Sequence, residues 1–220
     1  MAARLDHLVI VAKSLQQGRD YVLDKLGVDI PRGGKHAYMS THNCLMQLGN
    51  QSYLEVITID PDASPPPHPR WYDLDSPLQI KQADVEPSLV HWVVNVDDMH
   101  QCTDLSPAVW GKPHAVSRDD LSWRITIPED GRLPAAGFLP TVIQWDCPHP
   151  APAMPDTGCR LLRLKIYHNR KPWLEEQLHR IATDPCCNIP LVSEASSQNY
   201  LEAHILCPKG EVILKSHWHK

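Results

Sequence analysis

In the first part of the chain, hydrophobic residues recur in short runs that predict strands and one helix, in a fixed order. Residues 4–13 form a β-branched run typical of a strand. The next apolar positions recur at helical spacing, with Ser14 as a candidate helix start and Gly27 as a stop. Three further strands are predicted at 36–41, 44–49 and 53–59. The first part of the chain therefore predicts the order β-α-β-β-β.

The same order of predicted elements occurs twice more. The second copy comprises a strand at 88–96, a short helix at 97–105 and strands at 114–118, 121–127 and 140–146. The third comprises a strand at 159–168, a helix at 171–182 with Pro172 in its first turn, and strands at 188–193, 200–206 and 211–216. Asp97 or Asp98 could cap the helix of the second copy. The chain therefore predicts three β-α-β-β-β modules, at 4–60, 88–146 and 160–216.

Two proline-rich stretches connect the modules, at 61–87 and 147–159. A single module of about 55 residues cannot bury its sheet alone, so the modules must pack on one another. We therefore expect a single domain over residues 1–220. Its class is α+β, with repeated βαβββ modules that form curved mixed sheets.

Composition narrows the classes of protein. With 42% hydrophobic and 21% charged residues, the 220-residue chain has the composition of a soluble globular protein. Its formal charge of −5 leaves no basic surface for nucleic acid. No apolar run approaches the roughly 20 residues of a membrane span, and no signal peptide is evident. The seven cysteines lack the density of a disulfide scaffold, which favours reduced thiols and a cytoplasmic location.

Polar residues occupy matched places in the first two modules. His7 and His91 lie at equivalent positions of the opening strands, and Glu55 and Gln144 lie within the apolar closing strands. A buried carboxylate needs a partner, and two histidines with one carboxylate form a known facial site for a divalent transition metal. The alternative is structural: hydrogen-bonded core histidines, with Glu55 paired to a lysine or arginine at a sheet edge. The matched placement favours the metal site.

Other polar and aromatic residues are candidates for the rim of a pocket: His36, Asn43, Trp92, Trp145 and His149. Strand alternation places Trp92 and Trp145 on the faces opposite His91 and Gln144. Packing against helices is therefore the alternative to substrate binding for both indoles. For His36, which follows Gly-Gly-Lys, the alternative is a solvated loop residue.

The chain resembles the vicinal oxygen chelate superfamily, and within it the glyoxalase-like domain proteins. The stretches that carry the resemblance are LDHLVIVAKSLQQGRDYV, GGKHAYMSTHNCLMQLGNQSYLEVITIDPD, HWVVNVDDM, SWRITIPEDGRLPAAGFLPTVIQWDCPHP and PKGEVIL. The resemblance implies that paired modules enclose a cup-shaped cavity. It also implies a divalent metal held by the first and fourth strands of the modules, hence by His7, Glu55, His91 and Gln144. The third module has Arg163 and Lys165 on its opening strand, so we expect it to be structural.

The expected function follows from this resemblance. It is that of a divalent-metal-dependent lyase, isomerase or dioxygenase acting on a small oxygenated metabolite, with zinc, nickel, iron, manganese or cobalt as the ion. Glu55, His36 and His149 are the candidate general bases. The alternative is a small-molecule binding or sequestering protein of the same fold with no metal, which leaves open whether the protein is an enzyme. One chain or a homodimer could complete the cup.

Overall fold

The computed structural model describes residues 3–49, 51–102, 105–181 and 191–216. The first module contains β1 (Arg4–Val11), α1 (Leu15–Leu26), β2 (Arg32–His36), β3 (Thr41–Gln47) and β4 (Tyr53–Ile59). The helix α1 begins and ends at the predicted caps. The Ser14 hydroxyl accepts a hydrogen bond from the backbone N–H of Gln17, and Gly27 takes a left-handed φ of 75° while its N–H donates to Leu23.

The second and third modules repeat this order. The second contains β5 (Ser88–Asn95), the 3₁₀ turn η1 (Met99–Gln101), α3 (Pro107–Trp110), β6 (Lys112–Arg118), β7 (Leu121–Ile127), the 3₁₀ turn η2 (Pro134–Gly137) and β8 (Thr141–Trp145). The third contains β9 (Arg160–His168), α4 (Lys171–His179), β10 (Leu191–Ala195), β11 (Tyr200–Cys207) and β12 (Gly210–Lys215). The prediction of an α+β fold built from repeated βαβββ modules is confirmed.

Three local predictions differ from the structure. The strand expected at 36–41 lies earlier, at β2, and the chain turns at 37–40. In the described part of 97–105, which omits residues 103–104, the expected helix is a single 3₁₀ turn, in which Asp98 accepts from the N–H of His100 as a cap. The connections carry additional short elements, α2 (Pro77–Val85) and η3 (Ala151–Ala153). The predicted strand and helix residues within 182–190 lie outside the described residues.

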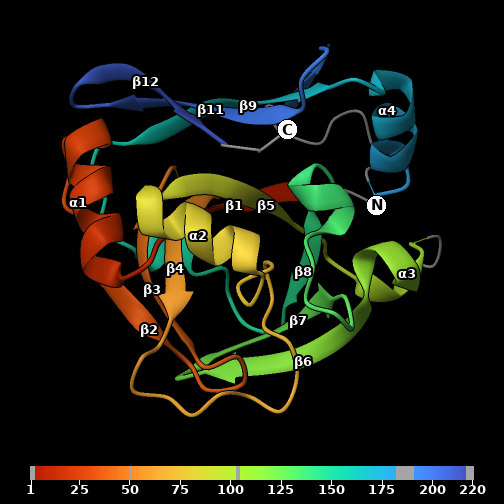
Figure 1. The fold of residues 1–220 in the computed structure, drawn as a ribbon, viewed down its shortest axis with the longest axis horizontal. Helices are drawn as coiled ribbons and strands as arrows, with labels where there is room; N and C mark the ends of the chain where they lie inside the picture. Colours follow the sequence, from red (N-terminus) through yellow and green to blue (C-terminus); the bar gives the residue numbers. More distant parts are fainter. Residues whose placement is uncertain (1–2, 50, 103–104, 182–190, 217–220) are drawn as a thin grey trace.

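Strands from the first two modules form one eight-stranded sheet in the order β2-β3-β4-β1-β5-β8-β7-β6. The opening strand β1 is central, parallel to β4 and antiparallel to β5, so the two modules join through their first strands. The edge strands β2 and β6 come close together on the side away from β1 and β5 (Figure 1). The sheet therefore curls into a nearly closed cup.

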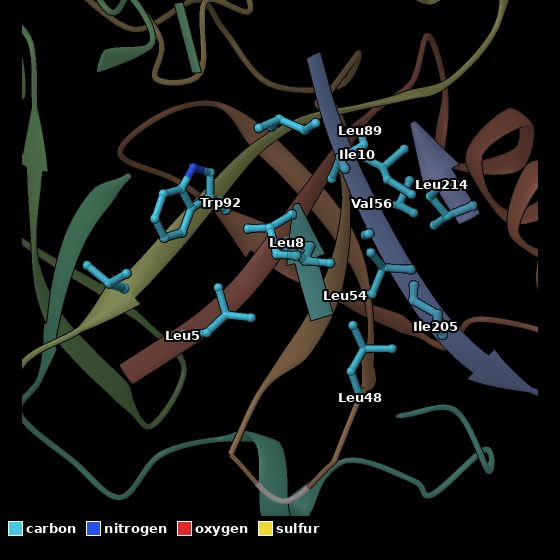
Figure 2. Packing of buried hydrophobic residues seen from close by; sticks show 14 of the residues in the cluster. Leu5, Leu8, Ile10, Leu48, Leu54, Val56, Leu89, Trp92, Ile205 and Leu214 are labelled. Carbon is cyan, nitrogen blue, oxygen red and sulfur yellow. The ribbon is translucent and has the colours of Figure 1, made fainter. Parts of the chain in front are cut away.

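The third module forms a four-stranded sheet, β10-β9-β11-β12, which lies over the outer face of the cup near β1 and β5 (Figure 1). Figure 2 shows the core between the two sheets, where Leu8, Leu54 and Trp92 of the cup pack near Ile205 and Leu214 of the third module. All five side chains are buried. Burial of each large apolar side chain contributes about 1.5–3 kcal/mol, so this core holds the third module in place.

The inner face of the cup has a second core, and the connection after β4 contributes to it. Trp71 and Tyr72 pack there against residues of the central strands, such as Val9. The backbone of Tyr72 is left-handed, with a φ of 57°, and the N–H of the next residue donates to the carbonyl of Gly131. Gly131 is required at this contact, because a Cβ there would lie 2.1 Å from the carbonyl oxygen of Arg70. The connection therefore packs firmly over the inside of the cup.

No helix in the described part of the chain is long and apolar enough to cross a membrane.

Candidate active site

A polar cavity lies inside the cup, between the first two modules and the connection that follows β4. Its volume is about 400 Å³ with the open mouth included. The lining residues are His7, His36, Asn43, Leu45, Tyr53, Glu55, Trp71, Tyr72, Arg118, Trp123, Ile125, Ile143, Trp145 and Pro150. Most come from strands of the cup, which position their side chains rigidly.

Asp6, next to the cavity, is a fully buried carboxylate held by four donors. Its Oδ1 accepts from His7 Nδ1 at 2.6 Å. Its Oδ2 accepts from Trp145 Nε1 at 2.8 Å, His149 Nε2 at 3.0 Å and Asn95 Nδ2 at 3.2 Å. Burial alone would raise the pKa of Asp6, but the hydrogen bonds from His149 and His7 outweigh it and hold the pKa well below its usual range. Asp6 is therefore ionised.

The ionised Asp6 determines which nitrogen of His7 is basic. Because a carboxylate only accepts, Nδ1 of His7 carries the hydrogen and Nε2 is left with a lone pair. A register shift between β1 and β5 occurs at Asp6, between the pairs Leu5–Val94 and His7–Val93. Such a bulge changes where neighbouring side chains of a strand point, and here it allows consecutive side chains to hydrogen-bond.

Glu55 and Tyr72 face the free nitrogen of His7. Glu55 Oε2 lies 3.6 Å from His7 Nε2, and the Tyr72 hydroxyl lies 3.5 Å from the same atom. Glu55 is buried, and its Oε1 accepts a 2.6 Å hydrogen bond from Asn43 Nδ2. Burial raises the pKa of Tyr72 well above its usual value, so its hydroxyl stays protonated. The Tyr53 ring stacks on the imidazole of His7 at a centroid distance of 4.6 Å and fixes its plane. Three groups able to exchange protons or hydrogen bonds thus meet at this end of the cavity.

Arg118 and His36 line the cavity on the other side of Asn43 from Glu55. Arg118 Nη1 lies 3.2 Å from His36 Nε2 and 3.2 Å from Asn43 Oδ1. Burial, and then the charge of Arg118, lower the pKa of His36 to about 3, so the imidazole is neutral at physiological pH. Its Nε2 accepts from Arg118, which leaves Nδ1 as the donor to Thr41 Oγ1 at 3.0 Å. His36 therefore orients Arg118 with an uncharged acceptor.

The structure brings together two of the four predicted metal ligands, His7 and Glu55. His91 lies on the inner face of the sheet, but its Nε2 accepts from the backbone N–H of Thr141 at 3.1 Å. Burial lowers the pKa of His91 to about 3 and keeps it neutral. Gln144 lies on the outer face of β8, where its Oε1 accepts from the N–H of Met99 at 2.8 Å.

The side chains present therefore do not fit the predicted metal site. A divalent transition metal needs at least three converging donors from this set, and His91 Nε2 and Gln144 Oε1 are already engaged elsewhere. Among the residues that the structure describes, no group of three or more His, Cys, Asp or Glu side chains is placed to hold a metal ion.

The other predicted site residues divide between the cavity and its surroundings. Asn43, His36 and Trp145 line the cavity. Gln144 and Trp145 do alternate, but it is the indole that faces inward, donating to Asp6. Trp92 lies in the core between the two sheets (Figure 2). His149 stands behind Asp6, with its side chain 21% exposed.

Sequence reasoning missed Asp6, Tyr72 and Arg118. Asp6 had a detectable signal, because a charged residue beside His7 inside an apolar strand needs a partner. Tyr72 lies in a proline-rich connection and Arg118 at the end of a polar strand. Neither position stands out in the hydrophobic pattern.

The nearly closed cup of paired βαβββ modules is the architecture that the resemblance to the glyoxalase-like domain proteins implied. Residues 5–182 match the model of the glyoxalase-like domain, so the chain belongs to the glyoxalase-like domain family. None of the curated proteins shows significant sequence similarity to the chain.

Several solved structures resemble the chain at low sequence identity. A hypothetical protein from Staphylococcus aureus is 11% identical with a TM-score of 0.57, over 98% of this chain and 85% of that one. Methylmalonyl-CoA epimerase from Mycobacterium tuberculosis is 15% identical with a TM-score of 0.41, over 64% of this chain and 86% of that one. A single-residue variant of Streptomyces coelicolor methylmalonyl-CoA epimerase, in complex with 2-nitronate-propionyl-CoA, is 15% identical with a TM-score of 0.43, over 67% of this chain and 97% of that one.

Proposed function

We propose that the protein is an enzyme that moves a proton on a small oxygenated metabolite, in an isomerase- or lyase-type reaction inside the cup. The observation that supports this most strongly is the 3.6 Å approach of Nε2 of the buried His7 to Oε2 of the buried Glu55 inside the cavity. Two proton-transfer groups on one side of a cavity are what abstraction and return of a proton require.

His7 is the proposed base. Its hydrogen bond to Asp6 presents Nε2 to the cavity, and the negative charge of Asp6 stabilises the imidazolium that forms when Nε2 takes a proton. The Tyr72 hydroxyl, which stays protonated, is placed to donate a hydrogen bond to a developing oxyanion. Glu55 is the second group that takes or returns the proton. Asn43 orients its carboxyl group.

This proposal assigns the chemistry to the protein's own acid–base groups. The sequence favoured a metal-dependent lyase, isomerase or dioxygenase. We assign no step to a metal, because only His7 and Glu55 of the predicted ligands converge. His36 and His149, the other predicted bases, orient Arg118 and Asp6 in our proposal.

Solvent deuterium exchange tests the proposal without knowledge of the product. The protein is incubated in D₂O with small carbonyl compounds that carry an acidic C–H, both carboxylic acids and their neutral amides. Loss of the C–H signal is followed by proton NMR. We expect exchange with the native protein and a loss of about a hundredfold or more in His7→Asn and Glu55→Gln. The asparagine amide can still donate to Asp6, so His7→Asn removes Nε2 and keeps the buried contact.

His100→Gln is the matched control, because His100 is exposed and does not line the cavity. Its exchange rate should equal that of the native protein. Binding of these compounds without exchange would overturn the enzyme proposal and support the alternative, a small-molecule binding protein. Exchange that persists in His7→Asn would refute the role of His7.

A further inference from the structure

Arg118 is a shielded cation without an acidic partner. Its guanidinium contacts His36 and Asn43, which are both uncharged. In the described part of the chain, no carboxylate oxygen lies within 4 Å of it. By comparison, Arg70 pairs with a carboxylate at 2.5 Å and Arg163 with one at 2.8 Å. A partly buried charge without a counter-ion costs free energy, so an arginine kept in this state in a cavity points to an anionic ligand.

Two buried donors at this cavity also lack partners. Arg118 Nε and Trp71 Nε1 are both inaccessible to solvent and without a hydrogen-bond acceptor. Both residues line the cavity. Arginine and tryptophan side chains can only donate, so both groups require an acceptor, which an oxyanion would supply.

The two ends of the cavity differ in polarity, and Asn43 lies between them. Its Oδ1 accepts from Arg118, and its Nδ2 donates to Glu55. The Arg118 end offers donors and a positive charge. The other end offers the acceptor atoms His7 Nε2 and Glu55 Oε2. A ligand that satisfies both ends carries its negative charge at one end and an acidic C–H at the other.

We propose that the substrate is a small carboxylic acid whose carboxylate binds Arg118, with the reacting carbon one or two bonds away beside His7 and Glu55. This inference deepens the proposed function and rests on it for the identity of the reacting end. The planar guanidinium matches a carboxylate through two parallel N–H groups. The cavity, about 400 Å³ with its open mouth, has room for an acid of a few carbon atoms.

Ligand-observed NMR titration tests the carboxylate site directly. The probes are acetate, pyruvate and 2-oxobutanoate, with 2-oxobutanamide as the neutral match and inorganic phosphate as the other oxyanion. We expect at least one of the three carboxylates to bind the native protein and the amide to bind much more weakly. Arg118→Gln should weaken carboxylate binding by about ten- to a hundredfold, the value of a charge-assisted hydrogen bond.

Two further variants separate anion recognition from a loss of structure. Arg118→Lys keeps the positive charge but lacks the two parallel N–H groups of the guanidinium. Its affinity for carboxylates should therefore lie between those of the native protein and Arg118→Gln. Arg124→Gln, on the neighbouring strand, removes an arginine whose partner is Asp146 outside the cavity, and it should bind like the native protein. Circular dichroism confirms that each variant is folded.

Each outcome of these titrations supports or overturns the inference of a carboxylate substrate. Failure of all three carboxylates to bind, equal binding of the amide, unchanged binding in Arg118→Gln, or a preference for phosphate would each overturn the inference. Carboxylate binding through Arg118 without any deuterium exchange would support the inference and refute the proposed reaction. Exchange on neutral amides but not on acids would support the proposed reaction and refute the inference of a carboxylate substrate. Retained binding with lost exchange in His7→Asn would support both.

Discussion

Replacement of Asp6 by asparagine tests the buried hydrogen-bond network behind the cavity. Three donors converge on Oδ2, from Trp145, His149 and Asn95, and His7 donates to Oδ1. An amide has one acceptor oxygen. If that oxygen meets the three donors, its NH₂ group faces His7 Nδ1 and forces the other tautomer, in which Nε2 carries the hydrogen. The variant therefore loses charge and also the basic atom.

The size of the effect follows from the contacts. A hydrogen bond to a charged group contributes about 1.5–3 kcal/mol and a neutral one about 0.5–1.5 kcal/mol, so three bonds to Oδ2 lose about 3 kcal/mol together. The lowered pKa of Asp6 shows that its negative charge stabilises the folded chain, because ionisation is easier in the folded chain than in the unfolded one. For a chain of this size, a loss of 3 kcal/mol lowers Tm by about 6–12 °C.

The assay is thermal unfolding of native protein and Asp6→Asn at several pH values. Because the folded-state pKa of Asp6 is depressed, its contribution is fully present above the unfolded value of about 4 and is lost as pH falls through the folded value. The difference in Tm should be complete at pH 7 and shrink below about pH 4. Asp156→Asn, at an exposed ion pair with Arg160, is the control and should change Tm little. A Tm within about 2 °C of native at pH 7 would refute the network's role.

Three further predictions follow from the site. Glu55→Gln should keep Tm, since an amide oxygen can still accept from Asn43, but lower deuterium exchange about a hundredfold; a rate within a few-fold of native would contradict its role. Gly131→Ala should cost more than about 1 kcal/mol in calorimetry, because its φ of 71° is left-handed and its Cβ would meet Arg70; an unchanged Tm would argue against that contact. Plasma mass spectrometry of untagged, dialysed protein should find substoichiometric divalent metal, and EDTA should not alter 2-oxobutanoate binding. Stoichiometric metal that is lost in His7→Ala/Glu55→Ala would instead establish a ligand set there.

The order of elements could be predicted because it depends on local signals. Apolar runs mark the strands, and Ser14 and Gly27 bound the first helix through contacts with residues three or four positions away. The matched placement of His7 and Glu55 on the opening and closing strands predicted that they share one site, and in the structure these two strands are neighbours in the sheet. Their parallel pairing, with Val9 opposite Glu55, is present in the structure.

The rest of the site depends on contacts that the hydrophobic pattern does not encode. Alternation separates Gln144 from Trp145 but cannot tell which faces inward, because the third module covers the outer face and makes both faces apolar. The register shift at Asp6 arises only from pairing with β5. Tyr72 lies in a connection whose composition is typical of a linker, and its backbone has a left-handed φ, which the sequence pattern does not predict.

The central place of β1 has a consequence for how the chain folds. This first strand pairs with β5, and the paired residues Val9 and His91 are some 80 positions apart in the sequence. The outer face of β1 is covered by the still later strands β9 to β12. Such sequence-distant pairing slows folding to milliseconds or seconds. Until the third module is synthesised, the apolar outer face of β1 and β5 remains uncovered and prone to aggregate. Truncation before β9 should therefore leave every cavity residue in the chain and yet yield insoluble protein.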